Sequence, residues 1–472
     1  MRNRHWLAGP RSLALGHVSH DRLGARRKQS SLDASRCRSS VKLADDAASG
    51  CICVWAWALL SRNVLTIRLD VVCPVGVAAH GGWSSKKGAW IAMARRLLPL
   101  VAALLLVGVL ATPARAIGSF GQPVTVDDPP CGFDAFNVDL ARDAGEVAHG
   151  FADLWGSNCN TGVRIDYFEG SGTTWTREAT PYHGFVVAVA WDATGTYLLY
   201  VDIARLELRI TKRLADGTYT GGRLLSTHVG PDGSLAEGDL VATGGQWWAV
   251  WREHVAPGGS AGDEFDQTDL FQAYTLGGAS HARRRITASP LWDSAPALAR
   301  TPASTFPLTL VWARGGSDFD PGQTDLRRAL GNAGGTWSSA GFATLGTLNF
   351  WPDVQVDGTT TYVTWNRDGR TVAADNRGGS FVSHTFNTPG IQSARPRIAV
   401  SSGNPVVGWT APAGPSFRAF VAKRVGSTWT GTYASPASAT RLQFLEGVAP
   451  KGGKATAVIL SFGSRLYATS ET

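Results

Sequence analysis

From residue 117 onward, hydrophobic and polar residues alternate in short runs that turn-forming residues interrupt. The clearest unit is residues 351–386, where Asp357-Gly358 separates the first two runs. Its four alternating runs are residues 352–356, 361–365, 370–374 and 380–383. A period of two residues is typical of a β-strand, and Asp-Gly between two such runs is a hairpin signal. The pattern predicts four short antiparallel strands and no long helix.

The same order of strands recurs along the chain, with an aromatic residue near the end of each second strand. These residues are Trp155, Tyr200, Trp251, Trp312, Trp365 and Trp409. Repeats of this length, rich in strands and turns, are typical of the blades of a β-propeller. We therefore predict an all-β fold in which these rings fill the space between neighbouring blades.

The repeats give six full units, and residues 440–472 contain three further candidate strands. A fourth strand for this last unit can come from residues 117–126. Pairing the two ends of the chain would close the ring and leave no exposed sheet edge. We predict a seven-bladed propeller, with six blades as the alternative.

Three units end in a Gly-x-Thr-Trp turn, at residues 172–175, 334–337 and 426–429, and a fourth has the shorter Gly-Thr-Tyr at 217–219. These turns resemble the Asp-box (BNR) repeats of sialidase-like propellers, although two of them lack the acidic residue. In that family the box is mainly a structural turn, so the resemblance implies a fold. Sialidase activity would further imply an arginine triad and a tyrosine–glutamate nucleophile pair. The usual Phe/Tyr-Arg-Ile-Pro motif is absent, and only Arg252, Arg314 and Arg367 could mimic the triad.

The N-terminal region predicts an export signal. Met93 begins a basic start that an apolar run and Ala114-Arg115-Ala116 follow, which together make a secretory signal peptide over residues 93–116. The apolar run is shorter than the ~20 residues that a membrane span needs, so a signal anchor is the lesser alternative. Residues 1–92 show no periodicity, and we interpret them as an over-extended or disordered start. The expected location is extracellular, with a propeller over residues 117–472.

The charge is unevenly distributed along the chain. Residues 1–116 carry 17 Lys+Arg and 5 Asp+Glu, a net charge of +12, whereas the whole chain carries +8. The remaining 356 residues therefore carry −4. The basic balance belongs to the segment before the predicted propeller, so it predicts neither nucleic-acid binding nor membrane binding.

Cysteines and acidic loops give little sign of metal chemistry. Cys131 and Cys159, the two cysteines after the signal, predict a disulfide in an exported protein. The histidines show no paired metal spacing, and we expect no metal and no cofactor. Acidic loops at residues 263–269 and 318–325 lack EF-hand spacing and are interpreted as solvated loops.

The candidate binding site is the mouth of the ring, where the segments that enter each inner strand converge. Aromatic rings beside carboxylates and guanidinium groups suit a sugar, which stacks on one and hydrogen-bonds the others. The candidate residues are Glu237, Asp239, Trp292, Trp351, Asp353, Arg395, Arg397 and Glu446 at the strand entries, with Arg252, Arg314 and Arg367 at the exits of second strands. The alternative is that they form salt bridges and turn caps between blades.

The predicted function is a secreted, monomeric binding module for a carbohydrate or a cell-surface ligand, without turnover. Two alternatives stay open: an exo-glycosidase of sialidase type, and a scaffold whose faces bind proteins. No nucleophile elbow and no phosphate-binding loop is present in the sequence.

Overall fold

The computed structural model describes two strands near the N-terminus and most of residues 117–472. Gaps in the second part fall at residues 118, 128–133, 144, 146, 156–162, 229–236, 256–266, 302–306, 316–323, 341, 343–347, 391–394, 414–415, 435–443, 452–453 and 463–464. The chain divides into two units, Met1–Leu104 and Leu105–Thr472. In the first, β1 (Cys53–Ser61) pairs antiparallel with β2 (Val64–Val72). The signal peptide predicted for residues 93–116 lies outside the described residues.

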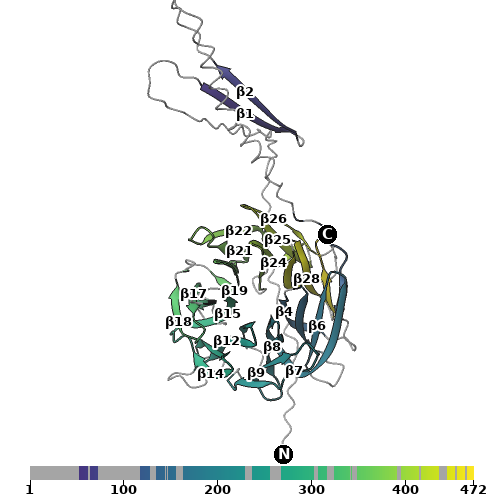
Figure 1. Cartoon of the computed structure of the whole chain (residues 1–472), viewed down its shortest axis with the longest axis vertical. Coiled ribbons are helices and arrows are strands. Elements are labelled where there is room, and N and C mark those ends of the chain that lie inside the picture. The colour runs from purple at the N-terminus through teal and green to yellow at the C-terminus, as the bar shows by residue number, and fades with distance from the viewer. Residues whose placement is uncertain are drawn as a thin grey trace, which may run out of the picture. The chain divides into compact units, whose positions relative to one another are not determined.

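The second unit is all-β, and its sheets surround a common centre as the blades of a propeller (Figure 1). We call the groups of paired strands blades A to G in chain order. Blade A contains β4 (Asp134–Arg142), β5 (Ala148–Trp155), β6 (Arg164–Ser171) and the first half of β7 (Thr174–Asp192). Blade B contains the second half of β7, β8 (Gly195–Asp202), β9 (Glu207–Arg213) and β10 (Arg223–Ser226). Blade C contains β11 (Gly238–Thr243), β12 (Gln246–His254), β13 (Thr268–Leu276) and β14 (Ala279–Arg285).

The other four blades follow the same order from the inner to the outer strand. Blade D contains β15 (Trp292–Arg300), β16 (Leu308–Gly315), β17 (Asp325–Gly331) and β18 (Trp337–Ala340). Blade E contains β19 (Asn349–Asp357), β20 (Thr360–Arg367), β21 (Arg370–Asp375) and β22 (Val382–Pro389). Blade F contains β23 (Arg397–Ser401), β24 (Asn404–Ala413), β25 (Ser416–Val425) and β26 (Thr428–Tyr433). Blade G contains β27 (Phe444–Lys451), β28 (Lys454–Phe462), β29 (Arg465–Thr469) and β3 (Val124–Asp127).

Blades A and B share one long strand instead of a loop. The first half of β7 pairs with β6, as far as Arg164↔His183, and the second half pairs with β8 from Gly184↔Asp202 onward. Gly184 has φ 143°, and a Cβ there would lie 1.7 Å from the carbonyl oxygen of Val201. Only glycine fits this crossing point, because any side chain would push the two strands apart.

Blade G is completed by the N-terminal end of the propeller. β3 pairs antiparallel with β29 through Leu466↔Asp127, Tyr467↔Thr125 and Ala468↔Val124. The amide of Gly121 also donates to the carbonyl of Ser470 at 3.0 Å. The prediction that residues 117–126 lead into the outer strand of the last unit is confirmed, and the pairing of the described strands is the arrangement that seven blades require.

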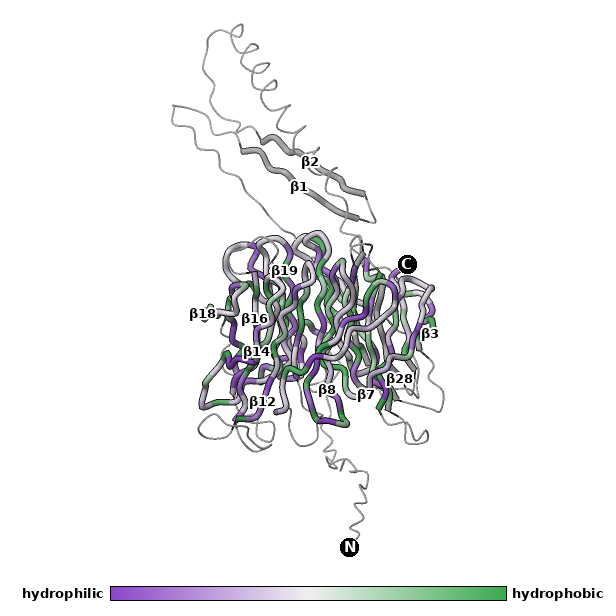
Figure 2. Tube along the Cα trace, turned by 60° about the horizontal axis from the view of Figure 1, so that its bottom comes forward, coloured by the Kyte–Doolittle hydropathy of each residue, from purple (hydrophilic) through white to green (hydrophobic). Residues whose placement is uncertain are grey.

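The core lies between blades. In the part of the chain with described side chains, seven hydrophobic clusters each join two successive blades, and one of them joins G to A. Figure 2 shows the hydrophobic residues within the strands that form the ring. Sheets that pack face to face around a circle bury both faces of every blade, which explains the near-continuous apolar second strands.

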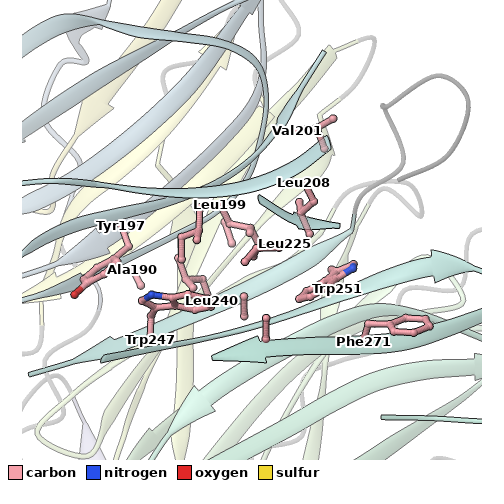
Figure 3. Close-up of a cluster of buried hydrophobic side chains, with 14 of the residues drawn as sticks. Ala190, Tyr197, Leu199, Val201, Leu208, Leu225, Leu240, Trp247, Trp251 and Phe271 are labelled. Carbon is pink, nitrogen blue, oxygen red and sulfur yellow. The ribbon is translucent and has the colours of Figure 1, made fainter. Parts of the chain in front are cut away.

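The repeated aromatic residues lie in these interfaces, as predicted. Trp251 is fully buried and packs between blades B and C with Leu240, Trp247 and Phe271 (Figure 3). The equivalent residues Tyr200, Trp312, Trp365 and Trp409 are at most 5% exposed. The side chain of Trp155 lies outside the described set. Truncating a buried aromatic residue of this kind to alanine costs about 3–5 kcal/mol.

Candidate functional site

The inner strands of all seven blades line one axial cavity of about 350 Å³. Each blade contains four antiparallel strands, so the chain returns to the same face before it enters the next inner strand. All inner strands therefore run in the same direction. The cavity has an entry end, where these strands begin, and a hairpin end, where each turns back into the second strand.

Three aspartates on alternate blades line this cavity and clamp the next inner strand. Asp139, Asp239 and Asp353 lie on β4, β11 and β19. Each accepts a hydrogen bond from a backbone amide of the following blade. The donors are Val189, Leu298 and Ile398, at 2.7, 2.6 and 2.8 Å. Blade A is thereby bonded to B, C to D, and E to F.

Two arginines, one just before β23 of blade F and one at its start, lie at the entry end. Arg395 Nη2 donates to the carbonyl oxygens of Pro296 and Pro352 at 3.1 and 3.2 Å. Each proline follows a residue with positive φ, Ala295 at 47° and Trp351 at 54°, within an irregularity of the inner strand. One guanidinium therefore satisfies two carbonyls that the sheet ladders leave unpaired at these bulges.

The second arginine binds across the ring. Arg397 Nη2 donates to the carbonyl of Val138 at 3.3 Å, and Nη1 lies 3.4 Å from Asp139 Oδ1. This contact joins blade F to blade A, which are separated in the ring by blade G. Because both side chains are about one-fifth exposed, water screens the ion pair only in part.

Two of the three cavity aspartates have a raised pKa. Burial raises the pKa of Asp239 to about 7; Arg395 lowers it, and the neighbouring Asp139 and Asp353 raise it. Burial also raises the pKa of Asp353, against the effect of Arg397 and Arg395. Asp239 therefore changes protonation near neutral pH, and in its protonated form it can donate as well as accept hydrogen bonds.

The structure brings only part of the sequence-predicted site together. Asp239, Asp353 and Arg397 line the cavity, and Arg395 lies against Pro352 at its entry. Trp351 is partly exposed at the bulge that begins β19 but is not among the lining residues. The side chain of Glu446 and both Cys131 and Cys159 lie outside the described residues, so the disulfide stays a prediction.

Two further candidates are occupied with contacts between blades. Glu237 Oε2 accepts from the amide of Ala295 at 2.6 Å and lies 3.6 Å from Arg252 Nη1. The ring of Trp292 packs edge-on against His254 at 5.7 Å between centroids. These contacts are the inter-blade bonds that the alternative interpretation of the sequence expected.

The three arginines considered for a triad do not line the cavity. Arg314 donates to both oxygens of buried Asp293, at 2.6 and 2.9 Å. Arg367 donates to Thr385 on the outer strand of its own blade at 2.8 Å. The Arg252 side chain is only 1% exposed. Each guanidinium is positioned by its own blade or its neighbour.

A tyrosine–glutamate pair lies in blade A, and its tyrosine is buried. Tyr167 Oη donates to Glu169 Oε2 at 2.6 Å, while Tyr167 as a whole is 2% exposed. Burial, reinforced by Glu169, raises its pKa further above the usual range for tyrosine. A buried phenol with raised pKa is a poor nucleophile, so this pair is a structural element of blade A.

Sequence reasoning missed several lining residues. Asp139 lies within a first strand and is followed by Leu or Val, as Asp239 and Asp353 also are. This shared pattern could have identified it. Arg142, Trp191, Arg300 and Gln355 also line the cavity, but nothing in their sequence context indicates the axis.

Two negative findings apply to the described residues alone. Nowhere among them do three His, Cys, Asp or Glu side chains gather as a metal site would need. The described part of the chain also contains no helix with the length and apolar character to cross a bilayer.

Comparisons with known proteins find solved structures of similar fold but no related sequence. No protein-family model and no curated sequence matches the chain. Among solved structures, an α-L-arabinanase of Penicillium chrysogenum complexed with arabinobiose is 12% identical, with a TM-score of 0.43 over 62% of this chain and 94% of that one. The six-bladed fucose-recognising lectin of Aleuria aurantia is 13% identical, with a TM-score of 0.42 over 66% and 98%. A Trypanosoma rangeli sialidase bound to sialic acid is 12% identical, with a TM-score of 0.38 over 75% and 57%. Similarities of this size carry no argument about a ligand, so the propeller assignment rests on the strand pairing itself.

Proposed function

We propose that the protein is an exported binding module that takes a carbohydrate, free or on a cell surface, at the entry end of the axial cavity and does not turn it over. The observation that carries this proposal is that Asp239, Asp353 and Arg397 line one cavity, with Arg395 at its entry end. Carboxylate acceptors and guanidinium donors stand within the same small space there.

The chemistry of the cavity suits sugar hydroxyl groups. A hydroxyl donates one hydrogen bond and accepts others, so it needs both kinds of partner. Both oxygens of Asp239 and of Asp353 accept a backbone amide. A carboxylate has about four acceptor positions, so each keeps capacity for a further hydrogen bond. The whole cavity, of about 350 Å³, lies at the lower end of the range for small-molecule sites, about 300–1,000 Å³.

Binding is favoured over hydrolysis by the positions of the charged groups. A sialidase-type site needs three arginines on one carboxylate, whereas Arg314 and Arg367 are held by Asp293 and Thr385. A retaining mechanism also needs an accessible nucleophile, and Tyr167 is buried.

The test is a glycan array followed by calorimetry with the glycans that bind. Arg397→Met should weaken binding at least tenfold, because it removes donors at the cavity. Arg367→Met is the matched control, since its guanidinium bonds to the outer strand, and it should bind like the wild type. A wild-type protein that binds no glycan, or equal losses in both variants, would refute the proposal. Release of the fluorophore from a sialoside would replace it with the hydrolase alternative.

Export is a separate part of the proposal. We expect N-terminal sequencing of the secreted protein to begin at Ile117, after Ala114-Arg115-Ala116. A mature chain that contains any part of residues 1–92 would refute the proposed start.

A further inference from the structure

The hairpin end of the axial cavity carries a second set of polar and aromatic side chains. These are Arg142, Trp191, Arg300 and Gln355, on the inner strands of blades A, B, D and E. We call them the hairpin-end residues. Gln355 is exposed, and the other three are partly exposed.

The strand register places these residues at one end. Arg142 pairs with Ala148, Trp191 with Thr196 and Arg300 with Leu308, all within two residue pairs of the turn into the second strand. Gln355 pairs with Tyr362, close to the next such turn.

The clamps confirm the order along the axis. Trp191 lies two residues beyond Val189, and Arg300 two beyond Leu298, the amides that the aspartates bind. Arg142 lies three residues beyond Asp139. At about 3.3 Å per residue, the hairpin-end residues are displaced by roughly 7–10 Å from the carboxylates toward the hairpins.

Arg300 differs from Arg314 and Arg377 in its charge balance. Arg314 and Arg377 each bond a buried aspartate, and the aspartate raises their pKa. For Arg300, burial lowers the pKa, and no carboxylate of the described chain offsets that effect. A partly exposed guanidinium with no carboxylate beside it can bond an anion that enters the cavity.

Trp191 supplies a rigid aromatic surface at the same end. One face of its indole stacks on the His149 ring, with centroids 6.1 Å apart and planes at 13°. His149 is itself fixed, by Tyr167 Oη at 2.6 Å and Asp143 Oδ2 at 3.3 Å. An indole fixed from behind loses little conformational freedom when a sugar ring packs against it.

We propose that the hairpin end of the axial cavity is a second binding site, which takes the carboxylate of an acidic sugar at Arg300 and packs the sugar ring against Trp191. A guanidinium binds a carboxylate through two parallel N–H···O bonds, a geometry that a neutral sugar cannot reproduce. The site does not depend on the proposal for the entry end, because it uses different residues and a different ligand charge.

The primary test is calorimetric titration of the whole protein with glucuronate, with glucose as the neutral comparison. The wild type should bind glucuronate at least tenfold more tightly than glucose. Arg300→Met should reduce glucuronate affinity at least tenfold, and Arg300→Lys should lose part of it, because lysine keeps the charge without the planar fork.

Arg328→Met is the matched control. Burial lowers the pKa of Arg328 in the same way, but its guanidinium lies over the Phe381 ring at 5.2 Å and does not line the cavity. Its glucuronate affinity should stay within twofold of the wild type. Equal losses in the Arg300 and Arg328 variants, or an unchanged Arg300→Met, would overturn the site.

A third arm separates the sugar ring from its charge. Inorganic sulfate presents the anion without a ring, so Trp191→Leu should weaken glucuronate and leave sulfate affinity unchanged. If this substitution weakens both ligands equally, or glucose binds as tightly as glucuronate, the proposed recognition of an acidic sugar is wrong.

Discussion

The substitution Asp239→Asn tests the electrostatics of the axial cavity most directly. In the wild type, burial raises the pKa of this carboxyl group from 3.8 to about 7. Between these two values the folded chain holds a proton that the unfolded chain has released. The stability contributed by the proton is complete below about pH 4 and is lost as the pH rises through about 7.

The magnitude follows from the size of the shift. At 1.36 kcal/mol per pKa unit, the difference corresponds to at most about 4 kcal/mol of unfolding free energy. Asp239 borders the cavity and is partly exposed, so water reduces this figure, and we expect about 1–3 kcal/mol. Asparagine cannot ionise and therefore removes the pH-dependent part. It also leaves one oxygen for the amides of Leu240 and Leu298, which costs about 1–3 kcal/mol at any pH.

The assay is urea denaturation of both proteins from pH 4 to pH 8. The free energy of unfolding of the wild type, relative to that of Asp239→Asn, should fall by about 1–3 kcal/mol as the pH rises across this range. Arg395→Met sharpens the test, because Arg395 lowers the pKa of Asp239 and its removal should shift the loss to higher pH. A difference between wild type and Asp239→Asn that does not change with pH would refute the reasoning.

Three further outcomes follow from the packing. Gly184→Ala should destabilise the protein by about 3 kcal/mol or more, since its Cβ meets the carbonyl of Val201; a melting temperature equal to the wild type's would contradict this. Asp293→Ala should lower the free energy of unfolding by about 3–5 kcal/mol, because Arg314 and the Trp312 indole lose their shared acceptor. Asp293→Asn should lower it less, because asparagine can still accept from the indole. Denaturation curves that rank the two variants in the opposite order would exclude this account. Deletion of β3 should open blade G and expose the edge of β29, with aggregation on size-exclusion chromatography as the readout and an unchanged monomer peak as the contrary result.

The sequence predicted the architecture well because a propeller repeats its local rules. Alternation identified the strands, and the aromatic residue at the end of each second strand marked the interfaces that the structure fills with Trp251, Trp312, Trp365 and Trp409. The crossing between blades A and B was not predicted. Pro181-Tyr182-His183-Gly184 has the composition of a turn, but tertiary pairing keeps it extended through 19 residues of β7.

The site was predicted less completely, for a physical reason. Strand entries are marked by charged and aromatic residues, so Asp239, Asp353, Arg395 and Arg397 stood out. Arg142 and Arg300 lie where inner strands end, and only the closed ring brings those ends to one axis. Nor could the sequence show that Asp293 already occupies Arg314, because the two lie on neighbouring strands 21 residues apart.

The pairing of β3 with β29 has a consequence for the order of assembly. Residues 124–127 are synthesised before residues 465–469, so the ring cannot close until the later segment has been made. Ser119 and Thr472 also lie in hydrogen-bond contact, so a short linker can join these two ends of the propeller. The molecule can accordingly be cut open at another blade boundary, and a circular permutant should keep every interface of the native ring.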